Sequence, residues 1–245
     1  MSDELFTTTM KRATREAHAI SDRLVNAKLL FALNNDSVWA EGLLVFYEIF
    51  KFLEIEMKKR PFDNIGKLFH DKMERTTAFE EDLAYYLGAN WKITYTIRDS
   101  VKNYLEHLKD LSDKDADLLM AYVYHLYMGL LSGGQILQKK RQLQRKVMKT
   151  SEKDLGYAVT TFHNISISEL KSQLREKMNS IANSIDNSKK DLLVEESKKV
   201  FELNNSIIKT VKGAEAAAFK NIFCFLSFVM AAFGVVYYLL RFTLS

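Results

Sequence analysis

The chain has 245 residues, of which 47% are hydrophobic, and it carries 35 basic and 31 acidic side chains. Nine glycines and one proline are too few for a turn-dense β-sandwich or barrel, so long helices are expected. The single cysteine, Cys224, excludes an intramolecular disulfide framework and a zinc site built from cysteines. Two of the surplus basic residues lie in an acid-free C-terminal stretch, so the body is nearly neutral, which excludes a nucleic-acid partner.

Helical spacing of apolar residues and capping signals predict an all-α body without strands. Pro61, the only proline, ends a long helix that Ser37 caps, and Gly88 closes a shorter one. Ser166 or Ser168 caps a later helix. In chain order, the first predicted helices cover residues 5–24, 37–60, a segment around 68, 78–87 and 97–108. A long helical stretch then begins at Asp113. Two further helices follow, one from 166 or 168 to 185 and one over about 191–208.

The C-terminal region contains 20 uncharged residues in a row, from Asn221 to Leu240. A helix of this length spans ~30 Å, the thickness of the hydrocarbon core of a bilayer. Tyr237 and Tyr238 fall where interfacial aromatic residues occur in membrane helices. The run therefore predicts a transmembrane tail anchor, with a buried core helix as the alternative.

Four regions are predicted along the chain: a helical domain over 1–205, a linker over 206–220, the anchor over 221–240 and a short lumenal tail over 241–245. Lysines before the anchor place the helical domain in the cytosol, and the polar N-terminus does not resemble a signal peptide. The helical domain is expected to be monomeric.

A basic face with a histidine stands out in the first predicted helix. Lys11, Arg15 and His18 are spaced by four and three residues, so they share one face. Such a face can ligate a metal through the imidazole, lie against a planar group and pair with carboxylates at its edge. A structural or solvated histidine is the alternative. Lys171 and Arg175 form a second basic pair, which matters if it faces the same acidic groups.

The segment LYMGLLSGGQILQ, residues 126–138, places Gly129, Gly133 and Gly134 inside an apolar helical run. Each glycine costs a helix about 1 kcal/mol relative to alanine, so three of them require compensation. A bent helix whose backbone closely approaches a large ligand is one explanation. A helix–turn–helix corner or a tight helix crossing is the other.

The stretch LLMAYVYHLYMGLLSGGQ, residues 118–135, resembles the signature of heme oxygenases, in which a kinked helix covers the distal face of heme. KRATREAH, residues 11–18, is similar to the family's proximal helix, which supplies the axial histidine. DLAYYLGANW, residues 82–91, and KSQLREKMNS, residues 171–180, match further family segments in order. The resemblance covers roughly residues 5–205, and membrane-bound members also end in a hydrophobic tail.

The resemblance implies an all-α, multi-helix heme oxygenase-like bundle with a C-terminal transmembrane helix in the endoplasmic reticulum membrane. The implied reaction is oxidative cleavage of heme to biliverdin, carbon monoxide and ferrous iron, with heme as both substrate and cofactor. Oxygen is the oxidant, and electrons come from NADPH through a membrane-bound cytochrome reductase.

The same resemblance implies roles for individual residues. His18 is the implied proximal ligand of the heme iron, and Gly129 and Gly133 let the distal backbone approach the iron. The residues implied to hold the heme propionates are Lys11, Arg15, Tyr124, Lys171 and Arg175.

The sequence departs from the family pattern in the distal pocket. Leu130 stands where members usually carry an acid that organises water for proton delivery, and leucine takes part in no hydrogen bond. Tyr122 replaces a usual histidine, and Phe50 replaces a tyrosine. We therefore expect slow or poorly regioselective heme cleavage, with a membrane-tethered heme-binding protein as the alternative.

Two other protein classes fit the sequence less well. Apolar residues alternate by three and four over residues 167–185, as in a tail-anchored coiled-coil fusion protein, but the run ends after about three heptads. A non-heme metal enzyme requires paired ligands, and the histidines at positions 70, 107, 125 and 163 show no such spacing.

Overall fold

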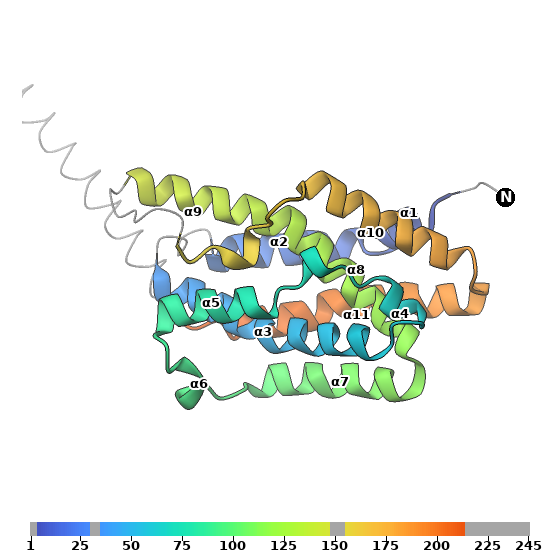
Figure 1. The fold of residues 1–245 in the computed structure, drawn as a ribbon, viewed down its shortest axis with the longest axis horizontal. Helices are drawn as coiled ribbons and strands as arrows, with labels where there is room; N and C mark the ends of the chain where they lie inside the picture. The colour runs from blue at the N-terminus through green and yellow to red at the C-terminus, as the bar shows by residue number, and fades with distance from the viewer. Residues whose placement is uncertain (1–3, 30–34, 148–154, 214–245) are drawn as a thin grey trace, which may run out of the picture.

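The computed structural model describes residues 4–29, 35–147 and 155–213, and the segments 1–3, 30–34, 148–154 and 214–245 lie outside it. The described residues form helices joined by short connections and contain no strand (Figure 1), which confirms the all-α prediction. The α-helices are α1 (Phe6–Ala13), α2 (Arg15–Leu29), α3 (Asp36–Lys59), α4 (Asn64–Lys67), α5 (Thr76–Leu87), α6 (Trp91–Thr94), α7 (Asp99–Asp115), α8 (Leu119–Gly129), α9 (Gln135–Val147), α10 (Ile167–Ala182) and α11 (Asn187–Lys209). Short 3-10 turns η1 (Asp71–Met73), η2 (Ala116–Leu118) and η4 (Ala158–Thr160) and a π-helical segment η3 (Leu130–Gly134) complete the set.

The first predicted helix is interrupted once, at Thr14. The Thr14 hydroxyl donates a hydrogen bond to the carbonyl oxygen of Met10, 2.9 Å away. Such back-bonding from a threonine bends helices. The single helix predicted over residues 5–24 is therefore wrong in detail, and the bend at Thr14 separates Lys11 from Arg15 and His18.

Two predicted helix starts also differ from the structure. Asn35, and not Ser37, caps α3, since its side chain accepts a hydrogen bond from the backbone N–H of Val38. Asp113 lies inside α7, which runs to Asp115, so it does not open the next helix. The predicted cap at Ser166 is confirmed, because its hydroxyl accepts from the N–H of Glu169 at 3.1 Å.

The core of the bundle lies between α3, α8 and α11. α3 packs against α5 and α7, and α11 packs against α2 and α8. Almost every residue of α8 between Leu119 and Tyr127 is buried. This burial fixes α8, and α8 carries the glycine-rich segment at its C-terminal end.

The predicted anchor, Asn221–Leu240, and the tail after it lie outside the described residues. Within residues 4–29, 35–147 and 155–213, no helix has the length and apolar character needed to cross a membrane. The domain boundaries and the anchor therefore stay predictions.

Candidate heme site

The glycine-rich segment forms a continuous helical path through a π-helical bulge. α8 ends at Gly129, the π-helix covers Leu130–Gly134, and α9 begins at Gln135. Gly129 and Leu130 both have helical dihedral angles, so the segment is not a helix–turn–helix corner. π-bulges occur often at functional sites because they displace the helix backbone.

Two of the three glycines face open space. A Cβ atom added to Gly129 or Gly133 would meet no other atom of the described structure within 4 Å. A tight crossing with another helix therefore does not explain them. Gly134 differs, because a Cβ there would lie 3.1 Å from the Leu130 side chain and 3.5 Å from Thr160. Gly134 serves packing, whereas Gly129 and Gly133 leave their side of the helix free for a ligand.

Hydrogen bonds hold the glycine-rich segment in place on both sides of the bulge. The Tyr127 hydroxyl, two residues before Gly129, donates to the buried carboxylate of Glu54 at 2.8 Å. Gln135, just after the bulge, donates from Nε2 to the carbonyl oxygen of Thr160 at 2.6 Å. A backbone fixed at both ends presents its glycine face in one position.

The η4 segment, which carries Thr160, is itself fastened to α5. The buried carboxylate of Asp82 accepts from the N–H groups of Ala158 and Val159 at 2.8 and 2.9 Å. Burial raises the pKa of Asp82 to about 6. The guanidinium of Arg75 donates to the carbonyl oxygen of Thr161 at 2.8 Å. Sequence reasoning missed these supports, because no local pattern links Arg75 and Asp82 to residues 76 to 86 positions later in the chain.

His18 lies near the start of α2 with one ring nitrogen occupied. Its Nδ1 is 2.9 Å from a carboxylate oxygen of Asp22, four residues on in the same helix. The side chain is 59% exposed, and its ring lies 5.6 Å from that of Phe201 on α11. A carboxylate at Nδ1 fixes the orientation of an imidazole and leaves Nε2 for a metal. The i,i+4 spacing of His18 and Asp22 was the available sequence signal for this partner.

Replacing Asp22 with alanine should weaken the hold of His18 on a metal. Loss of a partner of this kind typically costs about 10- to 100-fold in metal affinity or activity. Hemin titration followed by absorption measures the effect, and Glu16→Ala, which removes an exposed acid from the same helix, is the matched control. Equal hemin affinities for the Asp22→Ala and Glu16→Ala variants would show that the Asp22 carboxylate does not support His18 as an iron ligand.

The cationic residues of the predicted site lie on α1, α2 and α10. Lys11, Arg15 and Arg175 are exposed, and Lys171 is half-buried. α1 packs against α10, so the two basic pairs of the sequence come from neighbouring elements. Exposed cations on neighbouring helices suit carboxylates that reach the protein surface.

Tyr124 joins this cationic group from the buried side. Burial raises the pKa of its hydroxyl, while the guanidinium of Arg175 and the hydroxyl of Thr7, both within interaction distance, act in the opposite direction. α1 is tied to α10 at the same place, since the Thr7 N–H donates to the side chain of Asn179 at 3.0 Å. The structure therefore brings Tyr124 and Arg175 together, as the resemblance implied.

A second histidine, which sequence reasoning did not assign, lies beside the first. His125 packs edge-on against Phe201 with ring centroids 5.2 Å apart, so both histidines contact the same aromatic ring. Its Nε2 is shielded from solvent and has no hydrogen-bond partner among the described residues. Burial lowers the pKa of His125 to about 3, and the neighbouring His18 acts in the same direction.

This shielding predicts that His125 makes the protein sensitive to acid. The folded-state pKa lies below the ordinary value, so the unfolded state binds more protons. The free energy of unfolding then falls as pH drops below about 6.5, by about 1.4 kcal/mol per pH unit until about pH 3. Urea unfolding at about pH 7 and about pH 5 should show a smaller loss for His125→Phe than for wild type or for His163→Phe. Equal losses in all three would contradict the prediction.

Phe50 and Leu130, which are predicted to depart from the family pattern, both lie in apolar surroundings. The Phe50 ring packs against those of Phe79 and Tyr127 at 5.2 and 5.1 Å. Leu130 is half-buried and packs on the core. These positions supply no hydrogen-bonding group, as the sequence indicated.

Tyr122 belongs instead to a polar cluster on α7, α8 and α11. Its buried hydroxyl donates to the carboxylate of Glu196 at 2.5 Å and lies 2.7 Å from Nε2 of His107. Burial raises the pKa of Tyr122, and the hydrogen bond to Glu196 adds to the effect. Tyr104 continues the polar contacts, with its hydroxyl donating to the side chain of Asn204 at 3.2 Å.

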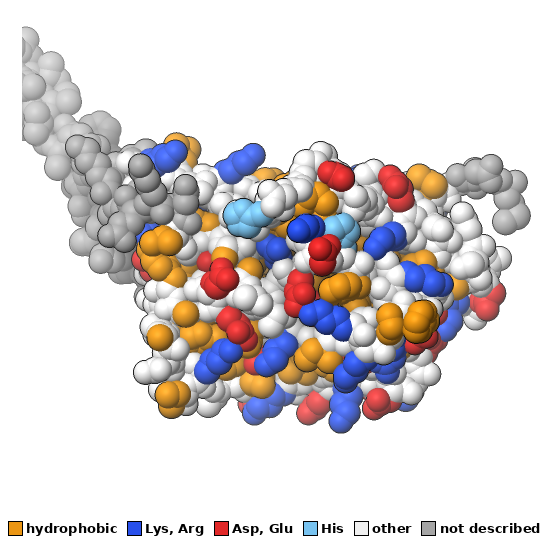
Figure 2. Space-filling view, viewed as in Figure 1, with side chains coloured by type: hydrophobic (Ala, Val, Ile, Leu, Met, Phe, Trp, Pro, Cys, Tyr) orange, Lys and Arg blue, Asp and Glu red, His pale blue; other side chains and the backbone are white. Residues whose placement is uncertain are grey.

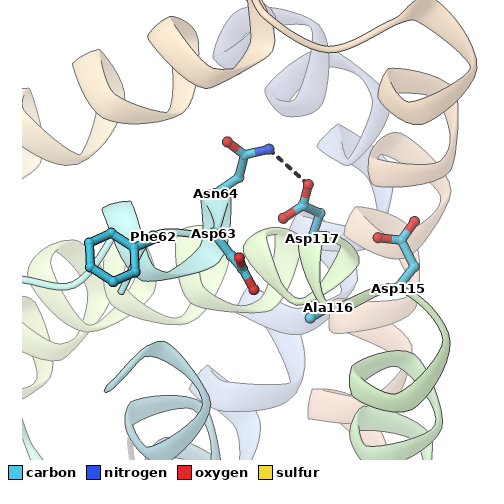
Figure 3. A pocket seen from close by; sticks show the side chains of 6 residues that line it. All are labelled: Phe62, Asp63, Asn64, Asp115, Ala116 and Asp117. Carbon is cyan, nitrogen blue, oxygen red and sulfur yellow. Dashed lines mark hydrogen bonds between the residues drawn. The ribbon is translucent and has the colours of Figure 1, made fainter. Parts of the chain in front are cut away.

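A polar pocket at another part of the bundle involves none of the predicted site residues. It lies where the segment before α4 meets the 3-10 turn η2 (Figure 3), and Asn64 donates to the carboxylate of Asp117 at 2.8 Å. Asp115, at its rim, pairs with Lys189. Within the described residues, no group of three or more histidine, cysteine or acidic side chains is arranged to hold a metal ion directly.

Comparison with known proteins agrees with this geometry. A family model described as heme oxygenase matches residues 4–210. Heme oxygenase 1 of Gallus gallus is 30% identical over 208 residues, which cover 83% of this chain and 68% of the relative.

Two solved structures share the fold. Heme oxygenase 2 from Chlamydomonas reinhardtii, solved without heme, is 28% identical with a TM-score of 0.77 and covers 85% of this chain and 98% of its own. Heme oxygenase-1 from a Synechocystis cyanobacterium, in complex with heme, is 22% identical with a TM-score of 0.76 over 94% of this chain and 100% of its own. The fold is thus the all-helical heme oxygenase fold, and the chain belongs to the heme oxygenase family.

Proposed function

We propose that this protein binds heme between α2 and the π-bulge that follows α8 and cleaves it to biliverdin, carbon monoxide and ferrous iron. One observation carries the proposal: a histidine with Nδ1 held by Asp22 occurs in the same small bundle as a fixed helix whose Gly129 and Gly133 face open space. Bound heme is both the substrate and the site of oxygen activation.

Each part of the site has a task in this proposal. Nε2 of His18 would hold the iron, and Asp22, 2.9 Å from Nδ1, would hold the imidazole in the orientation this requires. Gly129 and Gly133, which have no side chains, would leave room for the macrocycle beside the helix backbone. The cations that would pair with the propionates at the open edge are Lys11, Arg15, Lys171 and Arg175, with Tyr124 as a further donor.

The reaction also requires oxygen and electrons. We infer that NADPH supplies the electrons through a cytochrome reductase, and that residues 221–240 anchor the protein in the endoplasmic reticulum membrane with the helical domain in the cytosol. The helical domain is inferred to be monomeric.

The direct test uses the full chain in mild detergent, loaded with hemin. NADPH, the reductase and oxygen are added in the presence of catalase, the Soret band is followed, and the product is chromatographed. Soret loss with biliverdin is the expected result. A heme complex that persists, or bleaches without biliverdin, would contradict the enzymatic proposal.

A heme-binding protein without efficient ring cleavage is the second candidate, and Leu130 favours it. Proton delivery by a positioned side chain contributes typically about 10²- to 10⁴-fold to a rate, and leucine supplies none. Leu130→Asp distinguishes the two functions. A binder should gain biliverdin formation, whereas a competent enzyme should change mainly in rate or in the biliverdin isomers formed. Leu130→Asn, which is polar but does not ionise, is the control.

A further inference from the structure

The described chain leaves the bundle at a fixed point. The carbonyl oxygen of Thr210 accepts a hydrogen bond from Arg98 at 2.6 Å, and the N–H of Lys212 donates to Glu41 at 3.0 Å. Val211 between them is buried, and Arg98 also pairs with Glu41. Residues 210–213 are therefore fastened where α3 and α7 begin, although no helix continues there.

Little chain separates this point from the predicted anchor. The uncharged run starts at Asn221, eight residues after Gly213. Eight residues span at most roughly 28 Å even when fully extended. If residues 221–240 cross a bilayer, the end of the bundle that carries Gly213 must therefore lie close to the membrane surface.

Exposed apolar side chains occur at this same end. Ile93 on α6 is 80% exposed, Leu143 on α9 is 64% exposed, and Leu87 at the end of α5 is 43% exposed. Figure 1 shows the start of α3, the C-terminal ends of α5 and α9, and α6 together at this end. An ion pair between Arg141 on α9 and Asp36 on α3 confirms that these elements meet.

Basic side chains also lie at this end of the bundle, on α9. α9 carries five cationic residues and no acidic one, among them the exposed Lys139, Lys140 and Lys146. Figure 2 shows hydrophobic side chains on the surface over α5 and α6, and Lys and Arg side chains over α9. Exposed apolar residues next to cations are the combination that binds an anionic lipid surface.

We propose that this end of the bundle docks on an anionic bilayer, with Ile93 and Leu143 in its headgroup layer. The inference rests on the membrane anchor of the proposed function, and it adds a fixed orientation: the helical domain lies against the membrane on one defined surface. Phe62 is 91% exposed but follows the far end of α3. A helix of 24 residues is ~36 Å long, so Phe62 is held away from the bilayer.

The test places a fluorophore at one position at a time in the full chain. Cys224→Ser removes the only cysteine, and Ile93→Cys, Leu143→Cys and the control Phe62→Cys each supply a labelling site on an exposed side chain. Each protein is labelled with an environment-sensitive dye and reconstituted into phosphatidylcholine–phosphatidylserine vesicles, with or without a nitroxide quencher on the lipid headgroup. Flotation confirms that the protein is membrane-bound.

Blue-shifted emission with nitroxide-dependent loss of fluorescence at positions 93 and 143, and neither effect at 62, is the expected result. Equal quenching at all three positions, or none at any, would overturn the docking proposal while leaving the anchor intact. A blue shift at 93 without quenching would identify a protein partner or a second copy and would also overturn it. Failure to float with the vesicles would refute the anchor itself.

Discussion

Replacing His18 with alanine is expected to abolish biliverdin formation and to leave the fold of the heme-free protein intact. The side chain is 59% exposed, so its removal creates no buried cavity. It removes the proposed ligand of the iron, and Asp22 then has no imidazole to orient. Product chromatography measures the activity, and resonance Raman spectroscopy of the ferrous complex detects the iron–histidine bond.

The control is His163→Ala, which removes another exposed histidine and should change neither measurement. Added imidazole should restore the iron–histidine signal in the His18→Ala protein, because a free ligand can occupy the space of the lost ring. An iron–histidine band that survives in His18→Ala without imidazole would assign the ligand to another residue. His125, which contacts the same Phe201 ring, is then the first position to examine.

The second large effect is expected at Gly129 and Gly133, where stability and heme binding should change in opposite directions. Alanine at either position meets no other atom within 4 Å in the heme-free protein. Because alanine favours a helix by about 1 kcal/mol relative to glycine, the heme-free variants should be as stable as wild type or more stable. Heme affinity should fall, since an added methyl group in a close contact costs about 1–3 kcal/mol, which is roughly 5- to 150-fold in affinity.

Gly134→Ala is the matched control, because its added Cβ would point toward Leu130 and Thr160 and not into open space. Gly66→Ala provides the opposite case: a Cβ there would lie 1.8 Å from the Arg60 carbonyl oxygen, so the fold should be destabilised. Thermal unfolding of the heme-free proteins and hemin titration separate the two effects. Unchanged hemin affinity in both Gly129→Ala and Gly133→Ala would place the heme elsewhere.

The sequence alone determined the helical class and most helix positions. The helical spacing of apolar residues and the scarcity of glycine and proline predicted long helices. Gly88, predicted to end a helix, does end α5 with a positive φ of 90°. The family and the residues proposed to hold heme also followed from local motifs, since Lys11–His18 and Leu118–Gln135 are each contiguous.

Only the tertiary structure decided between the explanations of the glycines. In the sequence, Gly129, Gly133 and Gly134 are equivalent helix breakers. In the fold, two face open space and one packs on Leu130, because the direction of a helical side chain has meaning only once its neighbours are placed. The bend at Thr14 likewise could not be predicted from the sequence. A threonine hydroxyl can either donate a hydrogen bond to a carbonyl oxygen of its own helix or point to solvent, and the sequence does not distinguish the two.

The supports of the site were equally inaccessible to local reasoning. Glu54 reaches Tyr127 across 73 residues, and His125 joins His18 through the ring of Phe201. Buried carboxylates and imidazoles look like ordinary polar residues in a sequence, and their partners come from helices that meet only when the chain folds. The sequence by itself thus determined the family and the candidate site residues, whereas the packing of α3, α8 and α11 decided where those residues lie relative to one another.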